Sequence, residues 1–112
     1  MKNSEIKFVV QLDDKNIPEK IQWHATDGPS HDLLDARAVS ISLWDPEQDN
    51  TMRIDLWNKD MDVVEMKRFA IESMDGVAEM IKSATGDDEM YKEITAMCKK
   101  LVKHVEVLHK DK

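Results

Sequence analysis

The segment ARAVSISLWDPEQDNTMRIDLW, residues 36–57, decides the fold because apolar side chains recur at every second position in both of its halves. A period of two is that of a β-strand, whose alternate side chains point to opposite faces of the sheet. The two apolar triplets are Val39, Ile41 and Leu43, then Met52, Ile54 and Leu56. A turn-forming stretch with a proline separates them and stops the first strand. We predict a hairpin in which the triplets pair in reverse order, with Ile41 opposite Ile54.

A second alternating pattern lies on the N-terminal side of this segment, over residues 5–25. Its apolar positions are Ile6, Phe8, Val10 and Leu12, then Ile17, Ile21, Trp23 and Ala25. Residues 13–16 have turn chemistry between them. We predict another hairpin, in which Leu12 pairs with Ile17 and Phe8 therefore faces Ile21. A polar stretch with a Gly-Pro dipeptide follows and predicts a loop before residue 36.

The period changes to that of a helix after Asp60, with apolar residues spaced by three, four or seven. Asp62 and Glu65 fit a capping box, and Gly86 suits the left-handed position after a helix. These signals predict helices near 62–85 and 88–109. We interpret Gly76, inside the first helix, as a site of close packing. Because an antiparallel sheet with one apolar face needs a cover, we predict a single α+β domain over residues 1–112. We expect this domain to consist of a four-stranded antiparallel sheet, made of two consecutive hairpins, that is covered on one face by the two C-terminal helices.

Composition excludes several classes of function. The chain has 112 residues, with 16 Lys and Arg against 23 Asp and Glu, which gives a formal charge of −7. This balance disfavours nucleic acid as a partner. No apolar stretch approaches the roughly 20 residues that span a bilayer, so we expect no direct membrane insertion. The polar N-terminus lacks the apolar block of a signal peptide, and the single cysteine, Cys98, fits a reducing compartment. We expect a cytoplasmic protein.

The residues that most often carry chemistry are weakly arranged. His24 falls on the polar face of a predicted strand, and His31 lies in the polar loop with Asp32 and Asp35. A metal site needs ligands in fixed geometry, and this spacing favours solvated side chains instead. Cys98 lies beside the apolar stripe of the second helix, where we interpret it as a core residue. We therefore expect no catalytic residue, no metal site and no cofactor.

One feature does not fit a purely structural interpretation. The face of the second hairpin opposite its apolar triplets carries Trp44, Arg53, Asp55 and Trp57, with serines and a threonine between them. Tryptophan offers about 150–250 Å² of contact area and is uncommon on a solvent face. Two explanations stay open. This face is a protein-binding or oligomer surface, or loops, chain ends or sheet neighbours cover the tryptophans.

Several motifs together resemble the gliding-motility protein GldC family. The resemblance extends over nearly the whole chain and lies in Ser4–Phe8, Ser40–Asp45, Asn50–Trp57, Lys59–Met61, Glu65–Phe69, Ala84–Asp87 and Leu101–Val105. It implies a small soluble accessory protein of bacterial surface gliding. It implies no catalytic or cofactor residue.

The sequence leads to three hypotheses for the function. The leading hypothesis is a cytoplasmic accessory or adaptor protein of gliding motility that acts through protein-protein contacts, with a component of the gliding machinery as partner. A homo-oligomer is also compatible with the sequence. The alternative is a holdase-like export chaperone, because the order of elements and the acidic charge are similar to those of SecB, an analogy at the level of fold. A small enzyme is the third hypothesis, and a deep pocket with convergent polar groups would favour it.

Overall fold

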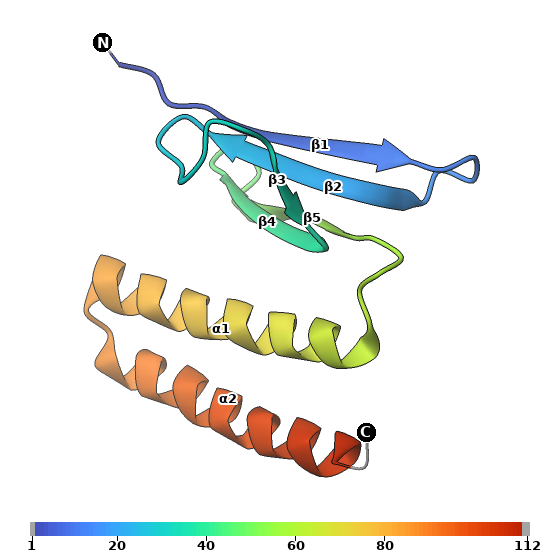
Figure 1. The fold of residues 1–112 in the computed structure, drawn as a ribbon. Helices are drawn as coiled ribbons and strands as arrows, with labels where there is room; N and C mark the ends of the chain where they lie inside the picture. Colours follow the sequence, from blue (N-terminus) through green and yellow to red (C-terminus); the bar gives the residue numbers. More distant parts are fainter. Residues whose placement is uncertain (1, 111–112) are drawn as a thin grey trace. The chain divides into compact units, whose positions relative to one another are not determined.

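The computed structural model describes residues 2–110 and contains five strands followed by two helices (Figure 1). The strands belong to one compact unit that ends at Met61, and the helices to a second that begins at Asp62. The elements are β1 (Ile6–Leu12), β2 (Pro18–Ala25), β3 (Leu34–Ala36), β4 (Ala38–Asp45), β5 (Asn50–Trp57), α1 (Val63–Thr85) and α2 (Asp88–His109). The prediction of an α+β chain with antiparallel strands and two C-terminal helices is confirmed.

The strands form two sheets, so the prediction of one four-stranded sheet is wrong. One sheet has the order β1-β2-β3, and the other consists of β4 and β5 alone. The extra strand, β3, lies where we predicted the end of a loop, and it pairs with β2 through Ile21 and Ala36. The second hairpin consequently begins at Ala38 rather than at Ala36. Three residues are too few to show a period, so only the neighbouring strand makes this segment extended.

The pairing of β4 with β5 agrees with the prediction throughout. Ile41 faces Ile54, Leu43 faces Met52 and Val39 faces Leu56. A slip by one residue would move every apolar side chain to the other face. A slip by two would leave one apolar residue of each triplet without an apolar partner, so the two matching triplets specify the register.

The pairing of β1 with β2 differs from the prediction by two residues. Phe8 faces Trp23 instead of Ile21, which faces Val10. The register changes next to Leu12, which pairs with Pro18 while Gln11 pairs with Lys20. One extra residue therefore stands on β2. A displacement of two keeps every side chain on its predicted face, and for this reason the alternation alone cannot detect it.

An aspartate organises the turn between these strands. The carboxylate of Asp13 accepts hydrogen bonds from the backbone N–H of Lys15 and Ile17, at 2.8 and 3.0 Å. Asn16 adopts a left-handed backbone conformation with φ 63°. Asparagine tolerates this region better than most residues. The core of the strand unit lies away from this turn in sequence: Ile21, in the middle of β2, is 1% exposed and is the main buried side chain of the unit.

The helices begin and end where the sequence predicts. Asp62 and Glu65 form the reciprocal capping box at the start of α1, and Gly86 ends it with φ 73°. Asp87 caps α2 by accepting from the backbone N–H of Met90. The side chains of Ile71, Ala78 and Cys98 are buried in the helical unit, and Cys98 Sγ lies 3.8 Å from the carbonyl oxygen of Ile71. Neither helix of the described chain combines the length and the apolar character needed to cross a membrane.

The glycine inside α1, Gly76, and the glycine that follows it, Gly86, should respond oppositely to substitution by alanine. A Cβ at Gly76 would meet no atom within 4 Å, so the interpretation of this residue as a close-packing site is wrong. Gly76→Ala should therefore raise the free energy of unfolding by about 1 kcal/mol through helix propensity. Gly86→Ala should lower it by about 1 kcal/mol, because alanine is strained at positive φ. Chemical denaturation of both variants checks the pair, and a loss of stability in Gly76→Ala would contradict the open space at that position.

Candidate functional site

The outer face of the second hairpin is the surface that the sequence singles out. We define the outer face as Ser40, Ser42 and Trp44 on β4 with Thr51, Arg53, Asp55 and Trp57 on β5. Trp44 is 64% exposed and Trp57 is 55% exposed. Trp57 lies opposite Ala38 at one end of the ladder, and Trp44 lies opposite Thr51 near the other end. Six residues of β4 separate the two positions, roughly 20 Å along the strand. The tryptophans therefore form no single cluster within one chain.

A hydrogen-bonded strip connects the middle of the outer face. The Arg53 guanidinium donates to Ser42 Oγ through Nη1 at 2.6 Å, to Ser40 Oγ through Nη2 at 2.7 Å and to Asp55 Oδ1 through Nη2 at 2.8 Å. Ser40 Oγ also donates to Asp55 Oδ1 at 2.7 Å. The Ser40 hydroxyl and then the Arg53 guanidinium hold the pKa of the Asp55 carboxyl below its usual value. Because the strip is ordered within the chain, it would lose little side-chain freedom on binding a partner.

The opposite face of the same hairpin is also open to solvent in part. We expected its apolar triplets to form the core, yet Leu43 is 55% exposed, Met52 58% and Ile54 49%. The side chains at the other end of the ladder, Val39 and Leu56, are less exposed. The hairpin therefore displays large apolar groups on both of its faces.

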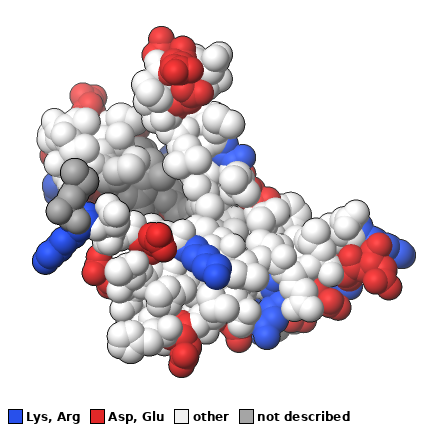
Figure 2. Space-filling view, turned by 90° about the horizontal axis from the view of Figure 1, so that it is seen from above, with Lys and Arg blue, Asp and Glu red and all other residues white. Residues whose placement is uncertain are grey.

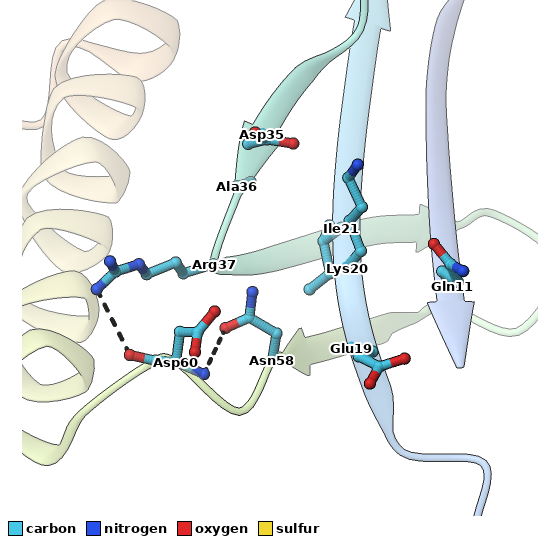
Figure 3. Close-up of a pocket in the computed structure, with 9 residues that line it drawn as sticks. All are labelled: Gln11, Glu19, Lys20, Ile21, Asp35, Ala36, Arg37, Asn58 and Asp60. Carbon is cyan, nitrogen blue, oxygen red and sulfur yellow. Dashed lines mark hydrogen bonds between the residues drawn. The ribbon is translucent and has the colours of Figure 1, made fainter. Parts of the chain in front are cut away.

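A cavity of about 660 Å³ lies elsewhere in the strand unit (Figure 3). Its walls come from the paired ends of β1, β2 and β3 and from the segment after β5, namely Gln11, Glu19, Lys20, Ile21, Asp35, Ala36, Arg37, Asn58 and Asp60. Asn58 is 8% exposed, and its Oδ1 accepts from the backbone N–H of Asp60 at 3.0 Å. Arg37 Nη1 donates to the carbonyl oxygen of Asp60 at 3.4 Å. The lining thus contains both basic and acidic residues together with the buried amide of Asn58.

Sequence reasoning missed this cavity. Its walls belong to four separate segments, and none of the four residues predicted for protein binding lies among them. The one available signal was Asn58, a polar residue directly after an apolar strand. That signal is weak, because asparagine is common in turns. The lining contains no serine, cysteine or histidine.

An ion pair joins the turn of the first hairpin to the segment after β5. Lys59 Nζ lies 2.6 Å from Asp13 Oδ2, and the Asp13 side chain is only 17% exposed. The hydrogen bond from Lys59, together with the backbone N–H groups of Ile17 and Lys15, lowers the pKa of Asp13 from 3.8 to about 2.

This lowered pKa predicts an acid-sensitive contribution to stability. A carboxyl whose pKa is lower in the folded state stabilises the fold above its unfolded value. The contribution of Asp13 should therefore be complete above pH 3.8 and disappear as the pH falls towards about 2. We expect Asp13→Asn to be less stable than the parent at neutral pH and to approach it at pH 2, in thermal unfolding across this range. A difference that does not depend on pH would contradict the role of the charge.

The histidines and the cysteine lie apart. His24 is in β2 and His31 is in the loop before β3. His109 Nε2 lies 3.1 Å from Lys67 Nζ within the helical unit. Cys98 is buried, and desolvation followed by the nearby Asp75 raises the pKa of its thiol. Among residues 2–110, no group of three or more His, Cys, Asp and Glu side chains is placed to hold a metal ion. On the face shown in Figure 2, Lys and Arg lie among acidic and uncharged side chains.

Comparison with known proteins gives one match. The family model described as gliding motility-associated protein GldC-like matches residues 18–107, which includes four of the five strands, all of α1 and most of α2. Searches of curated proteins and of solved structures found no match. The matched range covers well over half of the chain and agrees with the resemblance seen in the sequence motifs. The chain therefore belongs to the GldC-like family of gliding motility-associated proteins.

Proposed function

We propose that this protein is an accessory or adaptor protein of bacterial gliding motility, which acts in the cytoplasm through protein-protein contacts and has no catalytic activity. The observation that carries the proposal is the outer face, where two exposed tryptophans flank the ordered strip of Arg53 and Asp55. The family supplies the biological process. The partner is a component of the gliding machinery.

The residue types on the outer face support binding to a folded protein. Tryptophan and arginine are the side chains that most often dominate the energy of an interface. Each indole offers about 150–250 Å² of contact area, and the two lie near opposite ends of the outer face. Arg53 and Asp55 present a donor and an acceptor at its centre, so the face can select a partner by hydrogen bonding. The net charge of −7 favours a partner with a basic surface over nucleic acid.

A second candidate function is a holdase-like export chaperone, and the exposed methionines favour it. Met52 and Met80 are each 58% exposed, Met90 is 46% exposed and Met97 is 44% exposed. Methionine is flexible and adapts to varied apolar surfaces. A chaperone would suppress aggregation of many unfolded clients, whereas an adaptor would saturate with one folded partner.

The test combines crosslinking in gliding cells with two variants of the outer face. Trp57→Ala and Arg53→Glu should each lose capture of the crosslinked partner, by about 2 kcal/mol or more of binding energy. Both side chains are about half exposed, so the melting temperature should change little. Met80→Ala is the matched control, because it removes an equally exposed apolar side chain from α1.

The outcomes separate the hypotheses. Lost capture with retained stability in both outer-face variants supports the adaptor. Capture that survives in both variants overturns it. Equal protection of several unfolded clients by the parent and by both outer-face variants would favour the chaperone instead. A large fall in the melting temperature of Trp57→Ala would show that this indole belongs to a core.

A further inference from the structure

We infer that two copies of this chain pair antiparallel along the free edge of β4, which joins their hairpins into one four-stranded sheet. The inference goes beyond the proposed function, because it names a second copy as a partner and requires no other protein. It rests on which backbone groups point outward, on the residues of the strand and on the register that they permit.

One backbone hydrogen bond establishes which groups of β4 are unpaired. The N–H of Asn58 donates to the carbonyl oxygen of Arg37 at 2.9 Å, so these residues form a hydrogen-bonded pair at the end of the β4–β5 ladder. Such pairs alternate along an antiparallel ladder. Val39, Ile41 and Leu43 therefore turn their N–H and C=O groups towards β5. The groups that point the other way belong to Ala38, Ser40, Ser42 and Trp44. Within residues 2–110, no strand pairs with that edge.

The free edge of β4 carries none of the usual protection against strand addition. Native edge strands are commonly blocked by charged residues, prolines or bulges. Between Ala38 and Trp44 there is no charged residue and no proline, and the ladder with β5 is regular. The other free edges of the described strands differ, because β5 carries Arg53 and Asp55, β1 carries Lys7 and β3 carries Asp35. A two-stranded sheet is also marginally stable alone, and further strands stabilise it.

The sequence of β4 is complementary to itself in one register. Hydrogen-bonded pairs between copies must use only the outward-pointing residues, so the longest symmetric pairing places Ile41 opposite Ile41 of the second copy. Ser40 then lies opposite Ser42 of the second copy, and Ala38 lies opposite Trp44 of the second copy. No like charges meet. On the apolar face, Val39 lies opposite Leu43 of the second copy, so the apolar triplets continue across the junction.

This register also brings tryptophans together. Within one chain Ala38 lies opposite Trp57, and across the junction it lies opposite Trp44 of the second copy. Trp57 and the incoming Trp44 therefore stand in one row on the outer face, with the small side chain of Ala38 between them. Two strand spacings separate them, roughly 10 Å, which two indole side chains can bridge. The dimer has two such rows, whereas a single chain keeps its two tryptophans at opposite ends of the hairpin.

The first test measures the mass of the purified full chain by sedimentation equilibrium over the micromolar to millimolar range. We expect a reversible dimer of twice 13.0 kDa. Ser42→Pro removes an outward-pointing N–H from the β4 edge, once in each copy, and should raise the dissociation constant about 100-fold. Thr51→Pro is the matched control, since it removes an outward-pointing N–H from β5 and should leave the dimer intact. A monomer at every concentration overturns the inference, as does a dimer that only Thr51→Pro weakens.

The second test reads the register and stays informative if the proline variant fails to fold. In a Cys98→Ala background, Ile41→Cys should form an intermolecular disulfide under mild oxidation, because a non-hydrogen-bonded antiparallel pair brings the two Cα atoms within about 4.5 Å. Leu43→Cys is the control on the same strand and the same face. Its two copies would lie four residues apart, roughly 14 Å, and should not crosslink. Crosslinking of Leu43→Cys at the same rate, or no crosslinking of Ile41→Cys, overturns the proposed register.

Discussion

Ile21→Ala should lower the free energy of unfolding by roughly 2–5 kcal/mol, among the largest losses expected from a single truncation in this chain. Ile21 is 1% exposed in the middle of β2, between Val10 on β1 and Ala36 on β3. Truncation removes apolar contact from both neighbouring strands and leaves a cavity in the strand unit. Urea unfolding followed by circular dichroism measures the loss.

Ile54→Ala is the control for this prediction. Ile54 is 49% exposed, so its truncation should cost clearly less than that of Ile21. Alternation alone ranks the two isoleucines equally, since each lies on the apolar face of its strand. Equal losses in the two variants would show that Ile54 is buried in solution, and this would contradict the exposure seen in the structure.

Cys98→Asp should cost about 3 kcal/mol or more at neutral pH, because it places a charge at a buried position. Cys98 is 2% exposed. Desolvation, with a further contribution from Asp75, already raises the pKa of the thiol. The same surroundings would raise the pKa of an introduced carboxyl above its unfolded value. Its penalty is then complete above the folded pKa and vanishes below the unfolded pKa of about 3.9.

Cys98→Asn is the matched control, because asparagine has nearly the same shape and does not titrate. The difference in unfolding free energy between the two variants should shrink as the pH falls from 7 to 4. Thermal or urea unfolding of both variants at each pH gives this difference. A difference that stays constant over the range would contradict burial of the charge at this position.

Local signals predicted most of the elements correctly. The capping box of Asp62 and Glu65 and the left-handed Gly86 mark the ends of α1 in the sequence as they do in the structure. These motifs involve neighbours in the chain, so their hydrogen bonds form wherever the helix forms. The register of β4 with β5 was also predictable, because only one register pairs all three apolar residues of one strand with all three of the other.

The candidate site was predictable only in part. Alternation placed Trp44, Arg53, Asp55 and Trp57 on one face, and the structure puts all four there. The bonds from Arg53 to Ser40 and Ser42 depend on cross-strand geometry, which the sequence pattern does not contain. The cavity around Asn58 was not predictable, since its walls meet only when four segments fold together.

By itself, the sequence determined the strands with a clear period, the two helices with their caps, the acidic charge and the family. Each of these depends on residues close in the chain or on composition, so each can be predicted from the sequence without the tertiary structure. Tertiary structure alone decided the pairing of β3 with β2, the extra residue opposite Gln11 and the division into two sheets. It also decided that Ile21 is buried while Leu43 and Ile54 remain half exposed. The physical reason is that distant segments determine which strands pair and which side chains are buried. A period of two shows only which side chains share a face, and it does not show what packs against that face.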